Sequence, residues 1–463
     1  MSFSYFLGVL LFALSLRVRA PQMRWPAFSQ ARATALAAAL ATGLVAVFAC
    51  EMRFLDRAAQ TQAMPAWQAS LPLAIFYHNG LYGMRDPGAV VAGAEAFAVA
   101  ETALLAGLWG VLRRVDVFRP ALTAVILTGA AALGWIALHA ALSGPDVYAY
   151  AGDGLLANPY RPDAASLAHL DLRIREVWGP RFPPSPYGPL WNAVAHGIDV
   201  LGGSLEGRLL GFRLAGAAAL GACAIALARA RKPLAAALLA LDPAFWHAYV
   251  AEAHNDVLGV ALVLAAVAVR GRPAVAVVLV ALAGLVKLPF ILIGAVAFAG
   301  GATPRARVFL ACAAAAAALA ASAIFGGADY AWALRRTVEL YPIVLSPADV
   351  TVHAALVAVA LGAAAAALFA GRFFWGAAWS PLALAQFTCL QYLGWCVPYA
   401  ICDETAGALF LATFPLAAWQ ISLVFNTSLG YDVTRVVLLV VLVAAISRSI
   451  LRRPPAARAA EAA

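Results

Sequence analysis

The sequence predicts an all-α polytopic membrane protein, and two observations carry this prediction: the composition and the recurrence of long apolar runs. Of 463 residues, 64% are hydrophobic and only 12% are charged, and the mean hydropathy is +0.84. Soluble domains are roughly half apolar and about one quarter charged. A membrane-spanning helix needs about 20 apolar residues, and such runs recur along the whole chain. We therefore expect a single membrane domain over residues 1–463, with about 11 to 13 transmembrane helices by this length rule.

The first apolar segment, residues 2–16, has the length of a secretory signal peptide. No basic residue precedes its apolar core, and no convincing small-residue cleavage site follows it. These features favour a retained first span over a cleaved signal peptide.

Basic residues give the orientation in the membrane. A net charge of +9 is also typical of nucleic-acid binding, but here the basic residues form short clusters between apolar runs, as cytoplasmic loops do. We therefore expect no nucleic-acid partner. With these clusters inside the cell, the apolar runs up to Arg372 pair into hairpins that turn outside. Three later runs cannot all cross and still leave the basic tail inside. The clusters are Arg17/Arg19/Arg24/Arg32, Arg113/Arg114/Arg119, Arg229/Arg231/Lys232, Arg270/Arg272, Arg305/Arg307 and Arg448/Arg452/Arg453/Arg458.

Polar chemistry gathers in the predicted outer turns. The main extracytoplasmic loop covers residues 144–206, a second covers 326–349, and another large turn covers 51–91. A pore or carrier is expected to place ionisable groups near mid-membrane. The ionisable residues at the outer ends of spans favour instead an enzyme that takes one lipid-linked and one water-facing reactant. These residues are Asp146, Asp153, His254, Asp256 and Lys287.

The main loop begins SGPDVYAYAGDGLLANPYRP and ends RFPPSPYGPLWN. Residues 147–156 are predicted to be helical, so that Asp146, Tyr150 and Asp153 share one face and two carboxylates point into one cleft. The alternative is that Asp146 simply caps a helix start after Pro145. The NPY motif and the proline-rich stretch 183–189 cannot continue a helix, so they turn the loop sharply.

Four motifs in order carry a resemblance to a known family: DVYAYAGDGLLANPY, PSPYGPLW, LDPAFWHAYVAEAHNDVLGVALVL and AGLVKLPF. Together they resemble the bacterial polyprenol-phosphate-dependent α-mannosyltransferases of the C-type glycosyltransferase superfamily. The order of acid, tyrosines, NPY and PYGPL is also similar to the eukaryotic enzyme that adds the first mannose to glycosylphosphatidylinositol anchors. The resemblance covers about residues 144–290, with weaker echoes in LSPADV and QYLGWCVP.

The resemblance implies an inverting membrane hexosyltransferase, with mannose the expected sugar. The donor is then a polyprenyl-phosphate sugar, and the acceptor is a glycan or glycolipid. The site faces outside the cytoplasm, in the inner (plasma) membrane. Such transfer needs a carboxylate base and a cationic or polar grip on the leaving phosphate. Asp146 occupies the place of the family's first-loop acid and is the expected base, with Asp153 in support. The family's second acid, in DxD, is missing at Asp146-Val147-Tyr148, which argues against a bound divalent metal.

The remaining candidate residues have competing structural interpretations. His254, Asn255 and Asp256 either bind substrate or form the polar turn of an aromatic belt. Lys287 either contacts the lipid phosphate or snorkels to water. Arg335 and Arg336 are either phosphate ligands or a solvated pair. The predicted substrate-binding residues are Tyr148, Tyr150, Asn158, Tyr160, Tyr187, His254, Asn255, Asp256, Lys287, Arg335 and Arg336.

Two rival functions remain open from the residues. A polytopic transporter or lipid flippase would use the same polar groups as a path, but it predicts two similar halves, and the sequence shows no such repeat. A related enzyme would transfer arabinose or a whole oligosaccharide. The sequence fixes neither the sugar, the acceptor nor the oligomeric state. It contains no GxSxG, HExxH or Walker loop for other chemistries.

Overall fold

The computed structural model describes residues 28–60, 87–115, 117–140, 145–178, 182–299, 303–340, 390–401 and 404–425, with isolated positions between 358 and 371. Every regular element among these residues is a helix, and none of them lies in a strand. Several sequence-based expectations fall outside them: the segment 2–16, the LSPADV motif, most of the span expected at 376–399 and the span expected at 433–451. The predicted all-α class is confirmed for the described part of the chain.

Five described helices are long and apolar enough to cross a membrane, and a bent pair makes up to six. The chain is therefore a multi-span membrane protein, and the described residues account for about half of the expected spans. The long helices are α2 (Gln30–Gln60), α4 (Pro87–Leu112), α5 (Pro120–Leu138), α10 (Leu205–Arg229) and α16 (Pro304–Leu340).

The other spans expected before residue 304 are shorter or broken. The run expected at 234–250 is interrupted by Asp242-Pro243, and its two parts meet at 61°. A proline there removes a backbone donor and clashes with the preceding turn, so the helix cannot pass straight through. The parts are α11 (Pro233–Leu241), then α12 (Pro243–Trp246) with the π-helix η1 (His247–Ala251). The short helices that follow are α13 (Asp256–Ala268), α14 (Pro273–Val286), α15 (Phe290–Ile293) and the 3-10 helix η2 (Gly294–Phe298).

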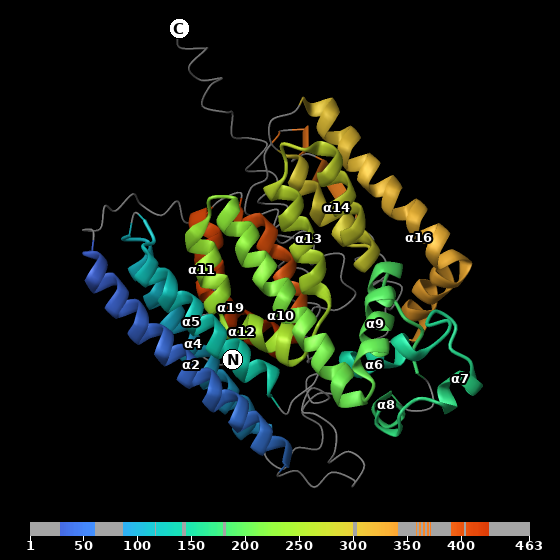
Figure 1. Ribbon diagram of the computed structural model, residues 1–463, viewed down its shortest axis with the longest axis horizontal. Helices are drawn as coiled ribbons and strands as arrows, with labels where there is room; N and C mark the ends of the chain where they lie inside the picture. The colour runs from blue at the N-terminus through green and yellow to red at the C-terminus, as the bar shows by residue number, and fades with distance from the viewer. Residues whose placement is uncertain are drawn as a thin grey trace.

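Small residues let the spans pack closely. Along α2, Ala33, Ala37 and Ala41 are buried at intervals of four residues, so one smooth stripe faces the bundle. The first helical position of α4, α5, α11 and α14 is a proline, which has the right φ and lacks only a donor that the first turn leaves unbonded. Figure 1 shows α2, α4 and α5 side by side, next to a central group of α10, α11, α13 and α14.

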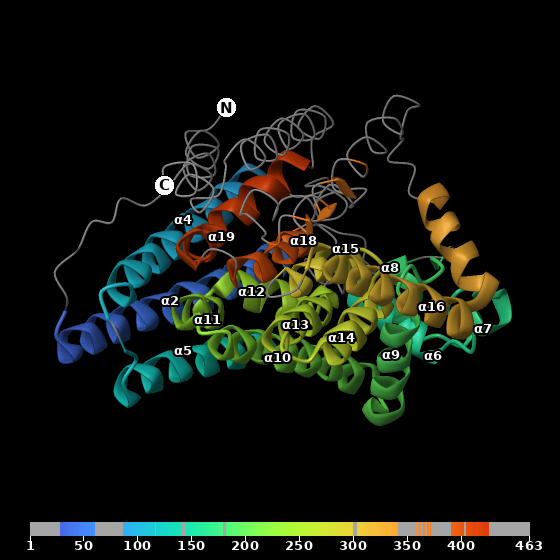
Figure 2. The same cartoon turned by 90° about the horizontal axis from the view of Figure 1, so that it is seen from above.

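The main loop forms a small helical layer with its own core. Tyr150, Trp191 and Phe212 are buried together, which attaches this layer to α10. Figure 2 shows the layer with α16 at the end of the molecule remote from α2, α4 and α5. Its helices are α6 (Pro145–Leu155), α7 (Ala164–Ala168), α8 (Leu172–Trp178) and α9 (Pro189–Gly202).

Helix α16 continues past the end predicted for its span. The described part of the second predicted loop, residues 326–340, is helical, and the direction changes at Gly327, whose φ is 59°. Glycine tolerates this left-handed backbone because it has no Cβ. The C-terminal described helices are α18 (Leu390–Leu393), η4 (Gly394–Ile401) and α19 (Glu404–Phe425).

Candidate functional site

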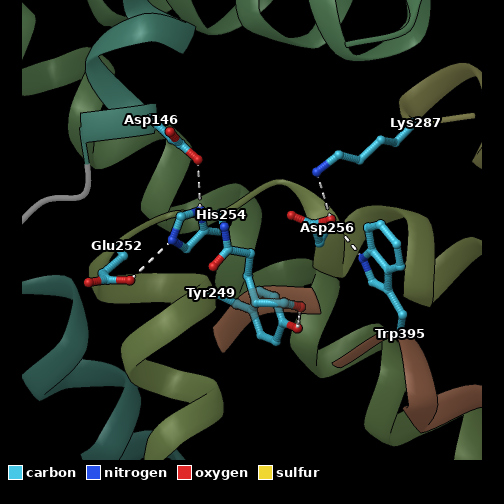
Figure 3. Close-up of polar contacts among 8 residues, drawn as sticks. Asp146, Tyr249, Glu252, His254, Asp256, Lys287 and Trp395 are labelled. Atoms are coloured by element: carbon cyan, nitrogen blue, oxygen red, sulfur yellow. Dashed lines mark hydrogen bonds and ion pairs between the residues drawn. The ribbon is translucent and has the colours of Figure 1, made fainter. Parts of the chain in front are cut away.

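Four chain segments bring polar residues to the same end of the bundle. Asp146 lies in the first turn of α6, directly after the span α5. His254 follows η1, Asp256 begins α13, and Lys287 ends α14. Because the helices alternate in direction, the basic clusters between them lie at the opposite ends. The sequence-predicted residues of three motifs therefore meet, as Figure 3 shows.

The first cluster joins two carboxylates through one imidazole. Nδ1 of His254 lies 3.3 Å from Oδ2 of Asp146, and Nε2 lies 3.1 Å from Oε2 of Glu252. His254 is only 3% exposed. Burial by itself lowers the pKa of His254, but the hydrogen bonds and charges of Asp146 and Glu252 outweigh burial and raise that pKa to about 10. At neutral pH the ring is an imidazolium, which donates a hydrogen bond to Glu252 and forms an ion pair with Asp146.

An unusual local backbone presents His254 to these acids. Residues His247–Ala251 form a π-helix, and the peptide N–H of His254 donates to the carbonyl of Ala248 across 3.2 Å. Ala253 has a φ of 57°, a conformation that non-glycine residues adopt at a cost. Single-turn π-helices and positive φ values are frequent at functional sites. The strain places His254 beside Asp146 instead of continuing the helix.

The second cluster joins Lys287, Asp256 and Trp395. Nζ of Lys287 lies 3.0 Å from Oδ1 of Asp256, and the same oxygen accepts a hydrogen bond of 2.7 Å from Nε1 of Trp395. The ammonium also lies over the rings of Tyr187, Tyr392 and Trp395, at 5.5, 4.5 and 5.5 Å from their centroids. Lys287 therefore has an acid partner and an aromatic enclosure, a pairing that the sequence analysis did not anticipate. Figure 3 shows this cluster beside the first one.

Asn255 lies between the two clusters in the chain and is 2% exposed. Neither its side-chain oxygen nor its side-chain nitrogen has a hydrogen-bond partner among the described residues. Burying an amide without hydrogen-bond partners costs free energy of folding, so such a group in a native protein indicates a ligand or a water molecule. Its donor and acceptor suit a sugar hydroxyl, which can accept and donate in turn.

Tyr150 of the first motif and Tyr187 of the second form an aromatic wall. Tyr150 packs edge to face on Tyr187, with ring centroids 5.1 Å apart. Burial raises the pKa of Tyr150 and of Tyr187 well above the ordinary value, so both remain neutral phenols. Burial also raises the pKa of Tyr148, which is 6% exposed. Tyr187 reaches the ammonium of Lys287, so the wall connects the α6 layer to the second cluster.

Asp153 lies in different surroundings from Asp146, although both belong to α6. It is 3% exposed, and burial raises its pKa well above the ordinary value, partly offset by a hydrogen bond with Ser185. Burial therefore favours the protonated form of Asp153, whose side chain lies in the interior of the α6 layer.

The NPY motif attaches the loop to α16. The side-chain amide of Asn158 donates to Oδ2 of Asp329 at 2.8 Å, while its oxygen accepts from the backbone of Tyr160 at 3.1 Å. Tyr160 packs against Tyr330 with centroids 5.0 Å apart, and burial raises the pKa of Tyr160 to about 12. Arg335 and Arg336 are exposed further along the same helix. Asn158 and Tyr160 thus make structural contacts.

Sequence reasoning missed several residues. Glu252 and Trp395 complete the two clusters. Glu51, Glu101 and His247 lie deeper, in the spans behind Glu252. Isolated acids inside apolar runs were the available signal, because an ionisable group within a membrane is costly and commonly functional. Among the described residues, no group of three or more His, Cys, Asp or Glu side chains is arranged to hold a metal ion.

Comparison with known families gives one match. The family model described as alpha-(1->6)-mannopyranosyltransferase, N-terminal domain, matches residues 72–305, about half of the chain. The matched stretch contains Asp146, His254, Asp256 and Lys287 and ends at the beginning of α16. No curated protein and no solved structure matches the chain.

Proposed function

Because the chain belongs to the alpha-(1->6)-mannopyranosyltransferase family, we propose that its two polar clusters transfer mannose from polyprenyl phosphate to an acceptor hydroxyl. The family implies the polyprenyl-phosphate-mannose donor. The proposed roles of single residues depend on the contacts around His254 and Lys287. The observation that best supports this proposal is the contact of Asp146 with the His254 imidazolium. This contact favours the ionised carboxylate that a base requires.

In the proposed step, Asp146 takes the proton of the acceptor hydroxyl. The hydroxyl oxygen attacks the anomeric carbon from the side opposite the phosphate, so the configuration inverts. The bond from this carbon to the phosphate oxygen breaks, and its electron pair leaves with polyprenyl phosphate. Asp146 is 15% exposed in its side chain and so is accessible to a substrate. Asp153 is buried, and burial favours its protonated form, so it supports the layer and does not act as base.

Lys287 is the proposed contact for the leaving phosphate. An ammonium has three donors, and Asp256 occupies one of them. The enclosing rings of Tyr187, Tyr392 and Trp395 hold the ammonium in place. Aromatic faces of this kind also suit the apolar side of a pyranose ring. Asn255 supplies a donor and an acceptor for sugar hydroxyls. Arg335 and Arg336 are a second source of positive charge at this end of α16.

The proposed location of the site is the outer face of the inner membrane. Arg119, Arg229, Arg272 and Arg305 lie at or beside the helix ends remote from the site. Basic residues mark the cytoplasmic side of membrane proteins. This sidedness suits a lipid-linked donor that is used outside the cytoplasm.

Transport or lipid flipping is the second candidate function. The bend of 61° at Asp242-Pro243 and the buried Glu101 favour it, since broken helices and intramembrane acids are typical of transporters. A flippase moves a lipid without making a glycosidic bond, so one assay separates the two functions.

The deciding experiment is to incubate purified protein in nanodiscs with radiolabelled polyprenyl-phosphate mannose and a series of mannosylated lipid or glycan acceptors. We expect label to appear in an acceptor product, and α-1,6-mannosidase to release it. Asp146→Asn protein is the matched control and should leave the donor intact. If no acceptor gains label while the donor lipid crosses the bilayer, transport replaces transfer as the function.

A further inference from the structure

A line of alternating acids and imidazoles leads from the candidate site into the helix bundle. Behind the Glu252 that binds His254, Oε1 of Glu252 lies 3.7 Å from Nε2 of His247. Nδ1 of His247 in turn lies 3.8 Å from Oε1 of Glu51. Glu51 and Glu101 then share a side-chain hydrogen bond. The line thus passes from the extramembrane α6 through η1 and α2 to α4.

The inner end of this line lies deep in the bundle. Glu101 is 2% exposed and occupies the middle of the span Ala92–Leu112. It is about 14 Å along the helix from Ala92 at 1.5 Å per residue. Asp242, at the bend between α11 and α12, is 0% exposed and interacts electrostatically with Glu101. An ionisable group at this depth is costly unless it is neutral or paired.

The contact between Glu51 and Glu101 requires a proton. Two ionised carboxylates at hydrogen-bonding distance in a medium without water repel strongly, so such pairs share one proton. One oxygen of Glu101 and one oxygen of Asp242 have no hydrogen-bond partner among the described residues. These oxygens are further places at which a proton can bind.

The charges along the line alternate in sign when the pair holds a single proton. Asp146 and Glu252 are anions on either side of the His254 cation, and His247 lies between Glu252 and the singly charged acid pair. From Asp146 to Glu51 each ion pair is shorter than 4 Å, and Glu51 is hydrogen-bonded to Glu101, so the charge of each group acts on the next one. The number of protons bound by Glu51 and Glu101 therefore influences the charge balance at Asp146. Arg213 of α10 donates hydrogen bonds to the carbonyl oxygens of Ala251 and Leu138.

We propose that Glu51 and Glu101 form an intramembrane proton-binding site that regulates the transfer site through His247, Glu252 and His254. The regulatory part rests on the proposed function of Asp146. When a second proton neutralises the pair, His247 keeps Glu252 as its only anionic partner in this line and draws it closer. His254 then depends on Asp146 alone, which becomes a weaker base. Acidification of the pair lowers mannosyl transfer.

The first test detects the bound proton without an activity measurement. Infrared spectra of the purified protein at neutral pH should show a carboxylic-acid C=O band that Glu101→Gln diminishes. Glu95→Gln makes the same substitution elsewhere on α4 and should leave the band unchanged. If Glu101→Gln protein does not fold, Glu51→Gln removes the other half of the pair. An unchanged band in the folded variant overturns the proton site.

The second test follows transfer against pH. The amide of Glu101→Gln donates to Glu51 and keeps it anionic, so we expect the acid limb of the kcat profile to move down by about one pH unit. Glu95→Gln should keep the wild-type profile. If Glu101→Gln removes the infrared C=O band but does not shift the acid limb of the kcat profile, the coupling to Asp146 is contradicted. Absence of transfer in the wild-type protein contradicts the proposed function instead, and the infrared band still decides the proton site.

Discussion

The carboxylate of Asp146 lies 3.3 Å from Nδ1 of His254. This contact joins the first turn of α6, outside the spans, to the turn that follows the bent pair of helices. It brings together an acid from one sequence motif and a histidine from another. The contact also gives Asp146 a cation as its neighbour, which a helix-capping acid would not require.

Asp146→Asn should therefore abolish turnover. The amide retains size and hydrogen bonding but cannot accept the hydroxyl proton, so we expect kcat to fall by about 10²- to 10⁴-fold with donor binding preserved. Steady-state kinetics and a donor-binding assay measure the two effects. A helix cap predicts a nearly silent change, because Asn caps about as well as Asp.

Asp153→Asn is the matched control on the same helix. Asp153 is buried, which favours its protonated form, so its amide analogue should cost little turnover. Loss of transfer with Asp153→Asn and not with Asp146→Asn would move the base to Asp153. Full activity in both variants would make Asp256 the next acid to test.

The stability that His254 contributes should depend on pH. Its pKa is raised from 6.5 to about 10 in the folded protein. A raised pKa gives stability that is complete below pH 6.5, declines as pH rises, and is lost above about pH 10. The Tm of the wild type should therefore exceed that of His254→Gln most at pH 6 and least above pH 10, in detergent. A Tm difference that is constant over this range would mean that His254 is not held as a cation.

Lys287 and Asp256 should show coupled effects. Lys287→Met leaves the buried Asp256 without its cation, so we expect a loss of about 3 kcal/mol in unfolding free energy. The double variant with Asp256→Asn should recover much of that stability. The donor KM should rise in both, and Lys287→Arg should be intermediate because charge remains but geometry changes. A donor KM that returns to wild type in the double variant would show that Lys287 is only structural.

Gly188 permits a close approach that the site needs. Its N–H donates to the carbonyl of Val286 at 3.0 Å, and a Cβ at this position would clash with the carbonyl of Leu285. Gly188→Ala should displace the segment before Lys287, costing about 1 to 3 kcal/mol and raising the donor KM. Gly197→Ala in α9 meets open space and should be neutral or slightly stabilising. Equal behaviour of the two variants in thermal unfolding would contradict the tight contact.

Sidedness can be tested by cysteine labelling. The exposed Cys50 and Cys312 are first replaced by alanine. A membrane-impermeant reagent should then label Ala157→Cys and Ala328→Cys in intact cells, and Arg231→Cys only after the membrane is opened. All three positions are exposed. Labelling of Arg231→Cys in intact cells would reverse the topology and place the site in the cytoplasm.

The sequence by itself determined the class of the protein. Hydropathy adds up over neighbouring residues, so the apolar runs predicted helical spans such as α5 and α10. Proline acts on its own turn, and the starts of α5, α11 and α14 follow from it. The four ordered motifs indicated the mannosyltransferase family, which the family match confirmed. These are local or pattern properties, and a chain reveals them without being folded.

Only the tertiary structure decided which polar groups meet. Asp256 binds Trp395 across 139 positions, and no periodicity links residues so far apart. The bend at Asp242-Pro243 and the positive φ of Ala253 set the direction of His254, and these depend on packing against α2, α5 and α10. That packing buries Asp153 and leaves Asp146 partly exposed beside His254, although both acids lie on α6. Because desolvation and charge pairing act through space and not along the chain, the protonation states at the site follow from the fold.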